Sequence, residues 1–203
     1  MATARPIVAF ALRLVILYAV LAAPWPGVRP GYAAMYRSAA DLVLGSMLDG
    51  RLRFEPIPGA ADGKDVMVRL RAAEGSNQRL SMPHDSRLTG YLPTAELIAL
   101  VLATPLAWPR RLIALAAGLM TVSAFIGVRL AALVAYVYAH EATGAPGGLI
   151  SAAYEVLAVA PTPGFVVPVL IWALVCFRPA EASAWMRRVA RPAGPADAAR
   201  HPP

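Results

Sequence analysis

Three adjacent side chains, His84, Asp85 and Ser86, have the residue types of the catalytic triad in serine hydrolases. In a triad the serine attacks a carbonyl carbon, the histidine removes the serine proton, and the aspartate orients the histidine. Neighbours in one loop cannot normally reach that geometry, so catalysis here requires partners from elsewhere in the chain. Ser86 and Thr89 are the candidate nucleophiles, and either hydroxyl is a poor nucleophile without a nearby base.

A long apolar stretch, residues 112–139, contains a single charged side chain, Arg129. An ionisable side chain at membrane depth is costly unless it is paired or hydrated, so Arg129 is a candidate functional residue. On a helix that advances about 100° per residue, Arg129 shares one face with Tyr136 and His140. The other residues on this face are Ala114, Gly118, Thr121 and Ala132.

We expect Arg129 to lie near the outer membrane boundary, about 26 Å from the start of its helix at 1.5 Å per residue. Glu96 enters the membrane from the same side, so an Arg129–Glu96 ion pair is geometrically possible. The predicted binding pocket is formed by Arg129, Glu96, Tyr136 and His140. The candidate catalytic residues are Arg129, His140, Ser86 and Thr89. Two alternatives stay open: Glu96 complements the helix dipole in a first turn, and Arg129 bonds lipid phosphates or backbone carbonyls.

Metal and cofactor signals are missing from the sequence. It has no metal-spaced histidine pair, no glycine-rich phosphate loop and no nucleophile elbow. Cys176 is the only cysteine, which excludes an intramolecular disulfide and a multi-cysteine metal site. The formal net charge of +7 comes largely from arginines that flank apolar stretches, and no basic patch with interleaved aromatic residues is present. We therefore expect no metal, no cofactor and no nucleic-acid partner.

The composition indicates an integral membrane protein, because 58% of the 203 residues are hydrophobic and the mean hydropathy is +0.55. Crossing the hydrocarbon core of about 30 Å takes about 20 apolar residues in a helix. The predicted spans are residues 1–24, 92–108, 112–139 and 165–177. The first resembles a signal peptide, but its apolar run is long and no small-x-small cleavage site follows, so we interpret it as an uncleaved span. Residues 149–158 form a helix that is re-entrant, interfacial or part of the fourth span.

Residues 25–91 predict a small α+β domain between the first two spans. Apolar residues recur at helical spacing over residues 32–49, which predicts an amphipathic helix. Residues 51–57, 66–72 and 79–82 are expected to form three strands, because residues 66–72 alternate between apolar and polar and turn residues separate the segments. We expect an antiparallel meander packed against the amphipathic helix.

Short basic segments set the orientation of the predicted spans. Arg5, the Arg110-Arg111 turn and the basic tail of residues 178–203 fall on one side of four spans, which the positive-inside rule makes cytoplasmic. Both termini are then cytoplasmic, residues 25–91 are extracytoplasmic, and the tail is partly disordered. The near-absence of lysine favours a bacterial protein. The predicted fold class is mainly α: a four-helix transmembrane bundle in the bacterial inner membrane with a small extracytoplasmic α+β domain.

A family resemblance rests on Trp108-Pro109-Arg110-Arg111, the apolar run that follows, Arg129 and a later histidine. Over residues 92–140 the chain resembles the exosortase/archaeosortase group of membrane proteins. The resemblance implies processing of C-terminal sorting signals by a membrane-facing cysteine, an arginine and often a histidine. Arg129 matches the arginine and His140 is the counterpart of the histidine.

The cysteine that the resemblance implies, within residues 84–94, is missing, and Cys176 lies in the last span on the cytoplasmic side. The resemblance therefore implies a shortened relative or accessory protein without cysteine transpeptidase activity. Our expectation is a noncatalytic component of an envelope protein-sorting or exopolysaccharide system, with the lipid bilayer and a membrane or envelope protein as partners. The alternatives are an exosortase-like transpeptidase or hydrolase that uses a serine or threonine, and a small transporter or channel component.

Overall fold

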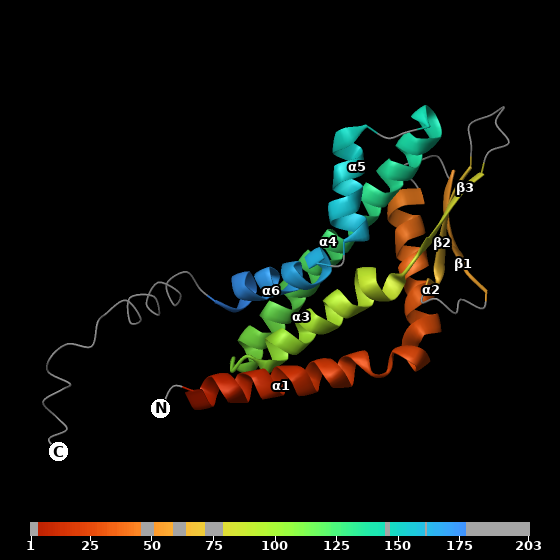
Figure 1. Ribbon diagram of the computed structural model, residues 1–203. Helices are drawn as coiled ribbons and strands as arrows, with labels where there is room; N and C mark the ends of the chain where they lie inside the picture. Colours follow the sequence, from red (N-terminus) through yellow and green to blue (C-terminus); the bar gives the residue numbers. More distant parts are fainter. Residues whose placement is uncertain are drawn as a thin grey trace, which may run out of the picture.

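A computed structural model describes residues 4–45, 51–58, 64–71, 79–144, 147–160 and 162–177 (Figure 1). These residues are mostly helical and carry one small sheet. The helices are α1 (Ala4–Ala22), α2 (Trp25–Leu44), α3 (Leu92–Ala103), α4 (Trp108–Thr143), α5 (Gly148–Tyr154) and α6 (Thr162–Cys176). Two π-helical turns precede α3 and follow α5: η2 (Arg87–Tyr91) and η3 (Glu155–Val159). The predicted disordered tail of residues 178–203 lies outside the described residues.

The sheet contains β1 (Leu52–Pro56), β2 (Val66–Arg71) and β3 (Arg79–His84) in the order β1-β2-β3, with both pairs antiparallel. The predicted meander is confirmed. The side chains of Val66, Val68 and Leu70 are almost fully buried, as the period-2 pattern of β2 requires. Complete burial of such a side chain contributes about 1.5–3 kcal/mol, so this face holds the sheet in place.

Helix α2 covers one part of the buried sheet face, and the second half of α4 covers the rest (Figure 1). The shared core contains Tyr36, Ala40, Leu44, Leu52, Phe54, Leu130, Leu133, Val134 and Val137 besides the β2 residues. The predicted start of the amphipathic helix at residue 32 is wrong, because α2 begins at Trp25. Pro26 occupies the first turn, where the missing N–H costs nothing, and the chain bends by 70° between α1 and α2.

Helix α4 has 36 residues and is therefore about 54 Å long at 1.5 Å per residue. Its segment Trp108–His140 has a mean hydropathy of 1.9 and is long and apolar enough to cross a membrane. The first half packs against α3, where Ala114 and Gly118 are buried and Gly118 lies against Leu97. Thr121 was expected on the same buried face, but it is exposed. Gly144, at φ 73°, ends the helix in a left-handed conformation that favours glycine.

By length and composition the described residues contain one candidate membrane span, α4, or up to three if two bent helix pairs each count as one. The pairs are Ile7–Ala22 with Trp25–Leu44, and Gly148–Val159 with Thr162–Cys176. The predicted span at residues 92–108 is too long at its end, because α3 ends at Ala103 and the chain before Pro105 is extended. The π-helical turn η2 lengthens this helix at its start instead. The predicted helix at residues 149–158 is confirmed as α5 with η3.

Four helix ends meet at the end of the molecule far from the sheet (Figure 1). The ring of Phe10 in α1 stacks on Trp172 in α6 at 5.8 Å, and the Trp172 indole N–H donates to the Thr104 hydroxyl at 2.8 Å. The guanidinium of Arg110, at the start of α4, donates to the carbonyl of Cys176 at 2.8 Å. Helix α3 packs against α1, α4 and α6. The N-terminal helix, the turn after α3 and the end of α6 therefore lie together.

Gly90 provides a testable close approach between η2 and α2. A Cβ at this position would lie 2.4 Å from the Tyr32 hydroxyl and 3.2 Å from the Tyr36 ring. We expect Gly90→Ala to lower the free energy of unfolding by about 1–3 kcal/mol, because the buried Tyr36 ring and the partly buried Tyr32 ring must shift. Thermal unfolding of the full chain in detergent measures the effect. Gly31→Ala is the matched control, since its Cβ meets nothing within 4 Å; equal stability of the two variants contradicts the prediction.

Candidate functional site

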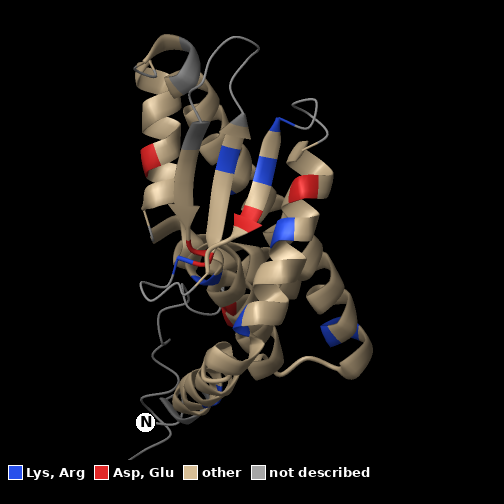
Figure 2. Cartoon of the chain, turned by 90° about the vertical axis from the view of Figure 1, so that its right-hand side faces the viewer, with Lys and Arg blue, Asp and Glu red and all other residues tan. Residues whose placement is uncertain are grey.

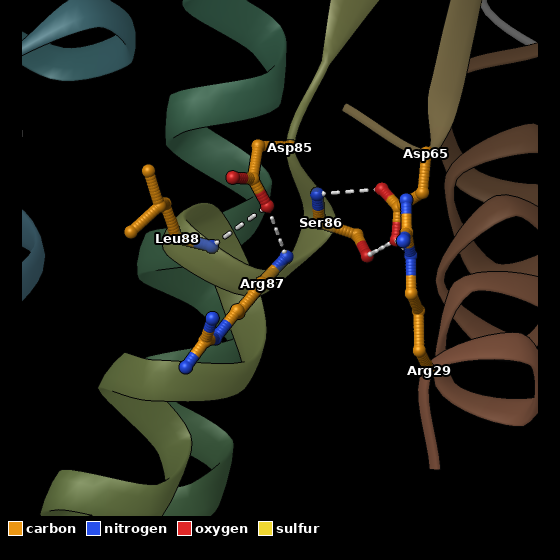
Figure 3. Close-up of polar contacts among 6 residues, drawn as sticks. All are labelled: Arg29, Asp65, Asp85, Ser86, Arg87 and Leu88. Atoms are coloured by element: carbon orange, nitrogen blue, oxygen red, sulfur yellow. Dashed lines mark hydrogen bonds and ion pairs between the residues drawn. The ribbon is translucent and has the colours of Figure 1, made fainter. Parts of the chain in front are cut away.

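Ser86 is hydrogen-bonded to Asp65, which directly precedes β2 (Figure 3). Its N–H and its hydroxyl donate to the two carboxylate oxygens of Asp65 at 3.0 and 2.8 Å. The Nε of Arg29 in α2 lies 3.8 Å from the same carboxylate. Ser86 is completely buried. Its proton is thus directed at a carboxylate rather than a histidine, in a position that a substrate does not reach.

Asp85 caps the helical segment that follows it. One of its carboxylate oxygens accepts the N–H groups of Arg87 and Leu88 at 2.8 and 3.2 Å (Figure 3). These N–H groups have no partner within the helix, so an aspartate at this position stabilises the start of η2. Burial raises the pKa of the Asp85 carboxyl. The Asp85 carboxylate therefore caps the helix and does not orient a histidine.

His84 contacts a tyrosine of α2. The Nε2 of His84 lies 3.1 Å from the Tyr36 hydroxyl, and the two rings stack at 6.1 Å. Burial, reinforced by the nearby Arg129 guanidinium, lowers the pKa of His84 to about 4, and burial raises the pKa of Tyr36. The histidine is therefore neutral at neutral pH, and its tautomer sets the direction of the hydrogen bond between Nε2 and the Tyr36 hydroxyl. The three adjacent side chains His84, Asp85 and Ser86 have three different partners, and no triad forms.

The lowered pKa of His84 predicts a loss of stability in acid. Between about pH 6.5 and pH 4 the unfolded chain binds a proton on this histidine that the folded chain does not bind. Stability is therefore fully present above pH 6.5 and falls as the pH falls toward 4, by about 3 kcal/mol at most. Thermal unfolding at several pH values measures the slope. His84→Gln should flatten it, and His140→Gln should not; equal slopes for the wild type and His84→Gln contradict the prediction.

Arg129 is buried, with 3% of its surface exposed, and its guanidinium binds backbone carbonyls from two other segments. The Nε donates to the carbonyl of Leu157, and the two terminal nitrogens donate to Ala158 at 3.4 Å and to Leu88 at 3.5 Å. Leu157 and Ala158 lie in the last turn of η3, where carbonyls have no helical partner and a cation complements the dipole. The alternative in which Arg129 bonds backbone carbonyls is the one observed.

Glu96 is not paired with Arg129. One of its carboxylate oxygens is buried without a hydrogen-bond partner among the described residues, and the carboxylate interacts electrostatically with Tyr18 of α1. Glu96 also does not lie in a first turn, because η2 runs directly into α3. Both expected arrangements of Glu96 are therefore wrong: the Arg129 guanidinium binds backbone carbonyls, and the π-helical turn η2 moves the helix start away from Glu96.

Tyr136 packs α5 against α4, and His140 stacks on Tyr136 within α4. Their rings stack at 6.2 Å, and Tyr136 stacks on Tyr154 of α5 at 4.0 Å. His140 lies about 16 Å along the helix from Arg129 at 1.5 Å per residue. No hydrogen bond joins His140 to Ser86 or to the buried Thr89 in the described part of the chain. The predicted pocket and the predicted catalytic set are thus not assembled.

The residue that sequence reasoning missed is Asp65. In the observed register Val66 lies opposite His84, which places Asp65 beside Asp85 and Ser86. The predicted third strand ended at residue 82, two residues too early, so this pairing did not follow from the sequence. The sequence signal for this pairing was the alternating pattern of the third strand, had it been extended from residue 82 to His84.

An apolar groove between α2 and α4 was not predicted either. It has a volume of about 310 Å³. Its lining includes Met35, Ala39 and Val43 of α2 and Ser123, Ile126, Gly127 and Leu130 of α4. Met35 and Val43 are exposed, and a Cβ on Gly127 would meet nothing within 4 Å. The groove is therefore open and can accept an apolar group.

The fold and these contacts define a mostly helical protein with a small antiparallel sheet, one long apolar helix and a buried polar network. Within the described residues, no group of three His, Cys, Asp or Glu side chains is placed to hold a metal ion. Comparisons of the chain with protein families, with curated proteins and with solved structures found no match.

Proposed function

We propose that this chain is a noncatalytic binding component of the bacterial inner membrane that serves an envelope protein-sorting or exopolysaccharide system. The observation that carries the proposal is the arrangement of the candidate catalytic groups. Ser86 is buried on Asp65, Arg129 binds three carbonyls, and His140 stacks on an aromatic ring elsewhere. A transpeptidase or hydrolase needs a nucleophile within reach of a base, and these contacts favour binding instead.

In the proposed membrane arrangement α1, η2 with α3, the first half of α4, and α6 cross the bilayer. Helix α3 packs against α1 and α4, which run in the opposite direction, and against α6, which runs in the same direction, and this alternation supports four spans (Figure 1). The meeting of Phe10, Trp172 and Arg110 at one end supports a common side for the two termini and the Arg110-Arg111 turn, which the positive-inside rule makes cytoplasmic. Figure 2 shows charged residues on the strands and few on the helices near the N-terminus, which supports a sheet outside the membrane.

The short helices fit a thin or locally thinned bilayer. Helix α6 has 15 residues, about 22 Å at 1.5 Å per residue, and a stretch shorter than the hydrocarbon core is accommodated by thinning. Large apolar side chains are exposed on the surfaces of α1, α4 and α6. They include Val15 and Ile16 of α1, Ile113 and Met120 of α4, and Leu170 and Leu174 of α6. Such surfaces are stable in lipid and costly in water.

The position of Leu88 supports the exosortase-like resemblance. The segment of residues 84–94, where the resemblance implies a cysteine, lies beside Arg129, because the Leu88 carbonyl accepts a hydrogen bond from its guanidinium. The residue of this segment that contacts Arg129 is thus a leucine, and its side chain cannot act as a nucleophile as a cysteine could. An exosortase-like arrangement without a reactive group is the geometry expected of an accessory relative, and the α2–α4 groove offers it a place to bind an apolar segment of a partner.

Complementation of a deletion strain tests the proposal, with delivery of envelope proteins and of exopolysaccharide as the readouts. Ser86→Ala and His140→Ala should restore delivery. Gly127→Leu should not, because Gly127 lines the groove and a side chain added there occupies it. The matched control Gly31→Leu should restore delivery; a Cβ at either glycine meets nothing within 4 Å. Protein levels in the membrane are measured for every variant. Loss of delivery with Ser86→Ala at an unchanged protein level contradicts the proposal and favours a serine-dependent transpeptidase.

A further inference from the structure

A second hollow lies between α2 and the membrane-proximal end of the sheet. It has a volume of about 410 Å³, and charged side chains line it, unlike the α2–α4 groove. Arg29, Ala33 and Arg37 line it from α2. On the other side it is lined by Ile57, directly after β1, and Asp65, directly before β2. We name it the Arg29–Arg37 cleft. No part of the proposed partner-binding groove contributes to it.

The two arginines enter the cleft from one face of α2. Residues 29, 33 and 37 are spaced by four, so they lie one above another on the helix. Ala33 is buried between them and keeps the floor of the cleft shallow. Arg37 makes no ion pair with any described residue. Arg29 lies 3.8 Å from Asp65, whose carboxylate already accepts two hydrogen bonds from Ser86. The lining contains two arginines and one aspartate, so its formal charge is positive.

The cleft lies close to the proposed membrane surface. Helix α2 starts at the 70° bend that ends α1, and Arg29 is in its second turn. An aromatic cluster marks the same level: Trp25 contacts Tyr91 at 4.7 Å and Tyr32 at 5.9 Å. Tryptophan and tyrosine favour the boundary between headgroups and hydrocarbon. A guanidinium group at this level meets lipid phosphates and binds them through paired N–H donors.

We propose that the Arg29–Arg37 cleft binds a phosphate group, and that its source is the headgroup of an anionic lipid in the outer leaflet. Arg37 and Arg29 hold the phosphate oxygens, and Asp65 keeps Arg29 directed into the cleft. The lipid source rests on the membrane placement in the proposed function; the phosphate chemistry does not. A bound headgroup would fix α2 against the membrane surface beside the α2–α4 groove.

The test uses the full chain in neutral detergent, with thermal unfolding as the readout. Short-chain phosphatidylglycerol, short-chain phosphatidylcholine and inorganic phosphate are added separately at equal concentration. Phosphatidylglycerol should raise the unfolding temperature by several degrees over phosphatidylcholine, and Arg37→Gln should abolish this difference. Arg53→Gln, an exposed arginine on β1 outside the cleft, is the matched control and should keep it.

Each outcome separates the possibilities. Protection by phosphatidylglycerol alone supports the lipid source, and equal protection by inorganic phosphate supports a phosphate site filled from solution. Protection by neither, or protection that survives Arg37→Gln, overturns the inference. A separate topology map with a reporter in residues 59–63 tests the membrane placement. A reporter found in the cytoplasm contradicts the proposed function and leaves the phosphate result standing.

Discussion

Replacing Arg129 by leucine is expected to lower the free energy of unfolding by about 3 kcal/mol. Leucine fills part of the volume but donates no hydrogen bond, so the carbonyls of Leu157, Ala158 and Leu88 lose their shared donor in a buried site. Arg129→Lys should be intermediate, because one ammonium group cannot reach three carbonyls on two segments. Thermal unfolding in detergent measures the global effect, and hydrogen exchange over residues 87–91 and 155–159 locates it.

The matched control is Arg53→Leu, which removes an exposed guanidinium from β1 and should change stability by less than about 0.5 kcal/mol. A stable Arg129→Leu protein that has lost function would contradict the structural role and assign Arg129 to binding or catalysis. Because Arg129 joins α4 to η2 and η3, its loss should loosen both π-helical turns together. If only one of the two turns loosened, the contact of Arg129 with the other turn would not be needed for the stability of that turn.

Local patterns predicted the elements well because local physics determines them. The alternating residues of β2 could bury only one face, and the apolar run of α4 could not be stable exposed to water. The strands and the long helix followed from these patterns. The start of α2 did not, because prolines usually end a helix. Pro26 is compatible with the first turn, but Pro30 lies inside α2.

The candidate site was less predictable, because its contacts join residues far apart in the sequence. Helical spacing placed Arg129 and Tyr136 on one face of α4, and the structure has both in contact with η3 or α5. It could not show that Arg129 would find backbone carbonyls. Those carbonyls are available because η3 ends there, and no single-sequence signal marks a π-helical turn. Glu96 was misplaced for the same reason, since η2 moved the helix start.

The remaining large effect is expected at Asp65. Asp65→Ala should lower the free energy of unfolding by about 3 kcal/mol, because the buried N–H and hydroxyl of Ser86 both lose their acceptor. The pair with Arg29 adds little, since that side chain is 29% exposed and the distance is 3.8 Å. Ser86→Ala should cost only about 1 kcal/mol, because Asp65 keeps the Ser86 N–H.

A double-mutant cycle distinguishes a structural pair from a reactive serine. If Asp65 acts mainly by accepting from Ser86, the double variant Asp65→Ala/Ser86→Ala should be no less stable than Asp65→Ala alone. Thermal unfolding of the four proteins at neutral pH supplies the cycle, and Asp65→Asn, which keeps one acceptor oxygen, should lie between the wild type and Asp65→Ala. Additive losses would mean that the two side chains act separately. Ser86 would then be released from its structural partner, and the noncatalytic assignment would lose its main support.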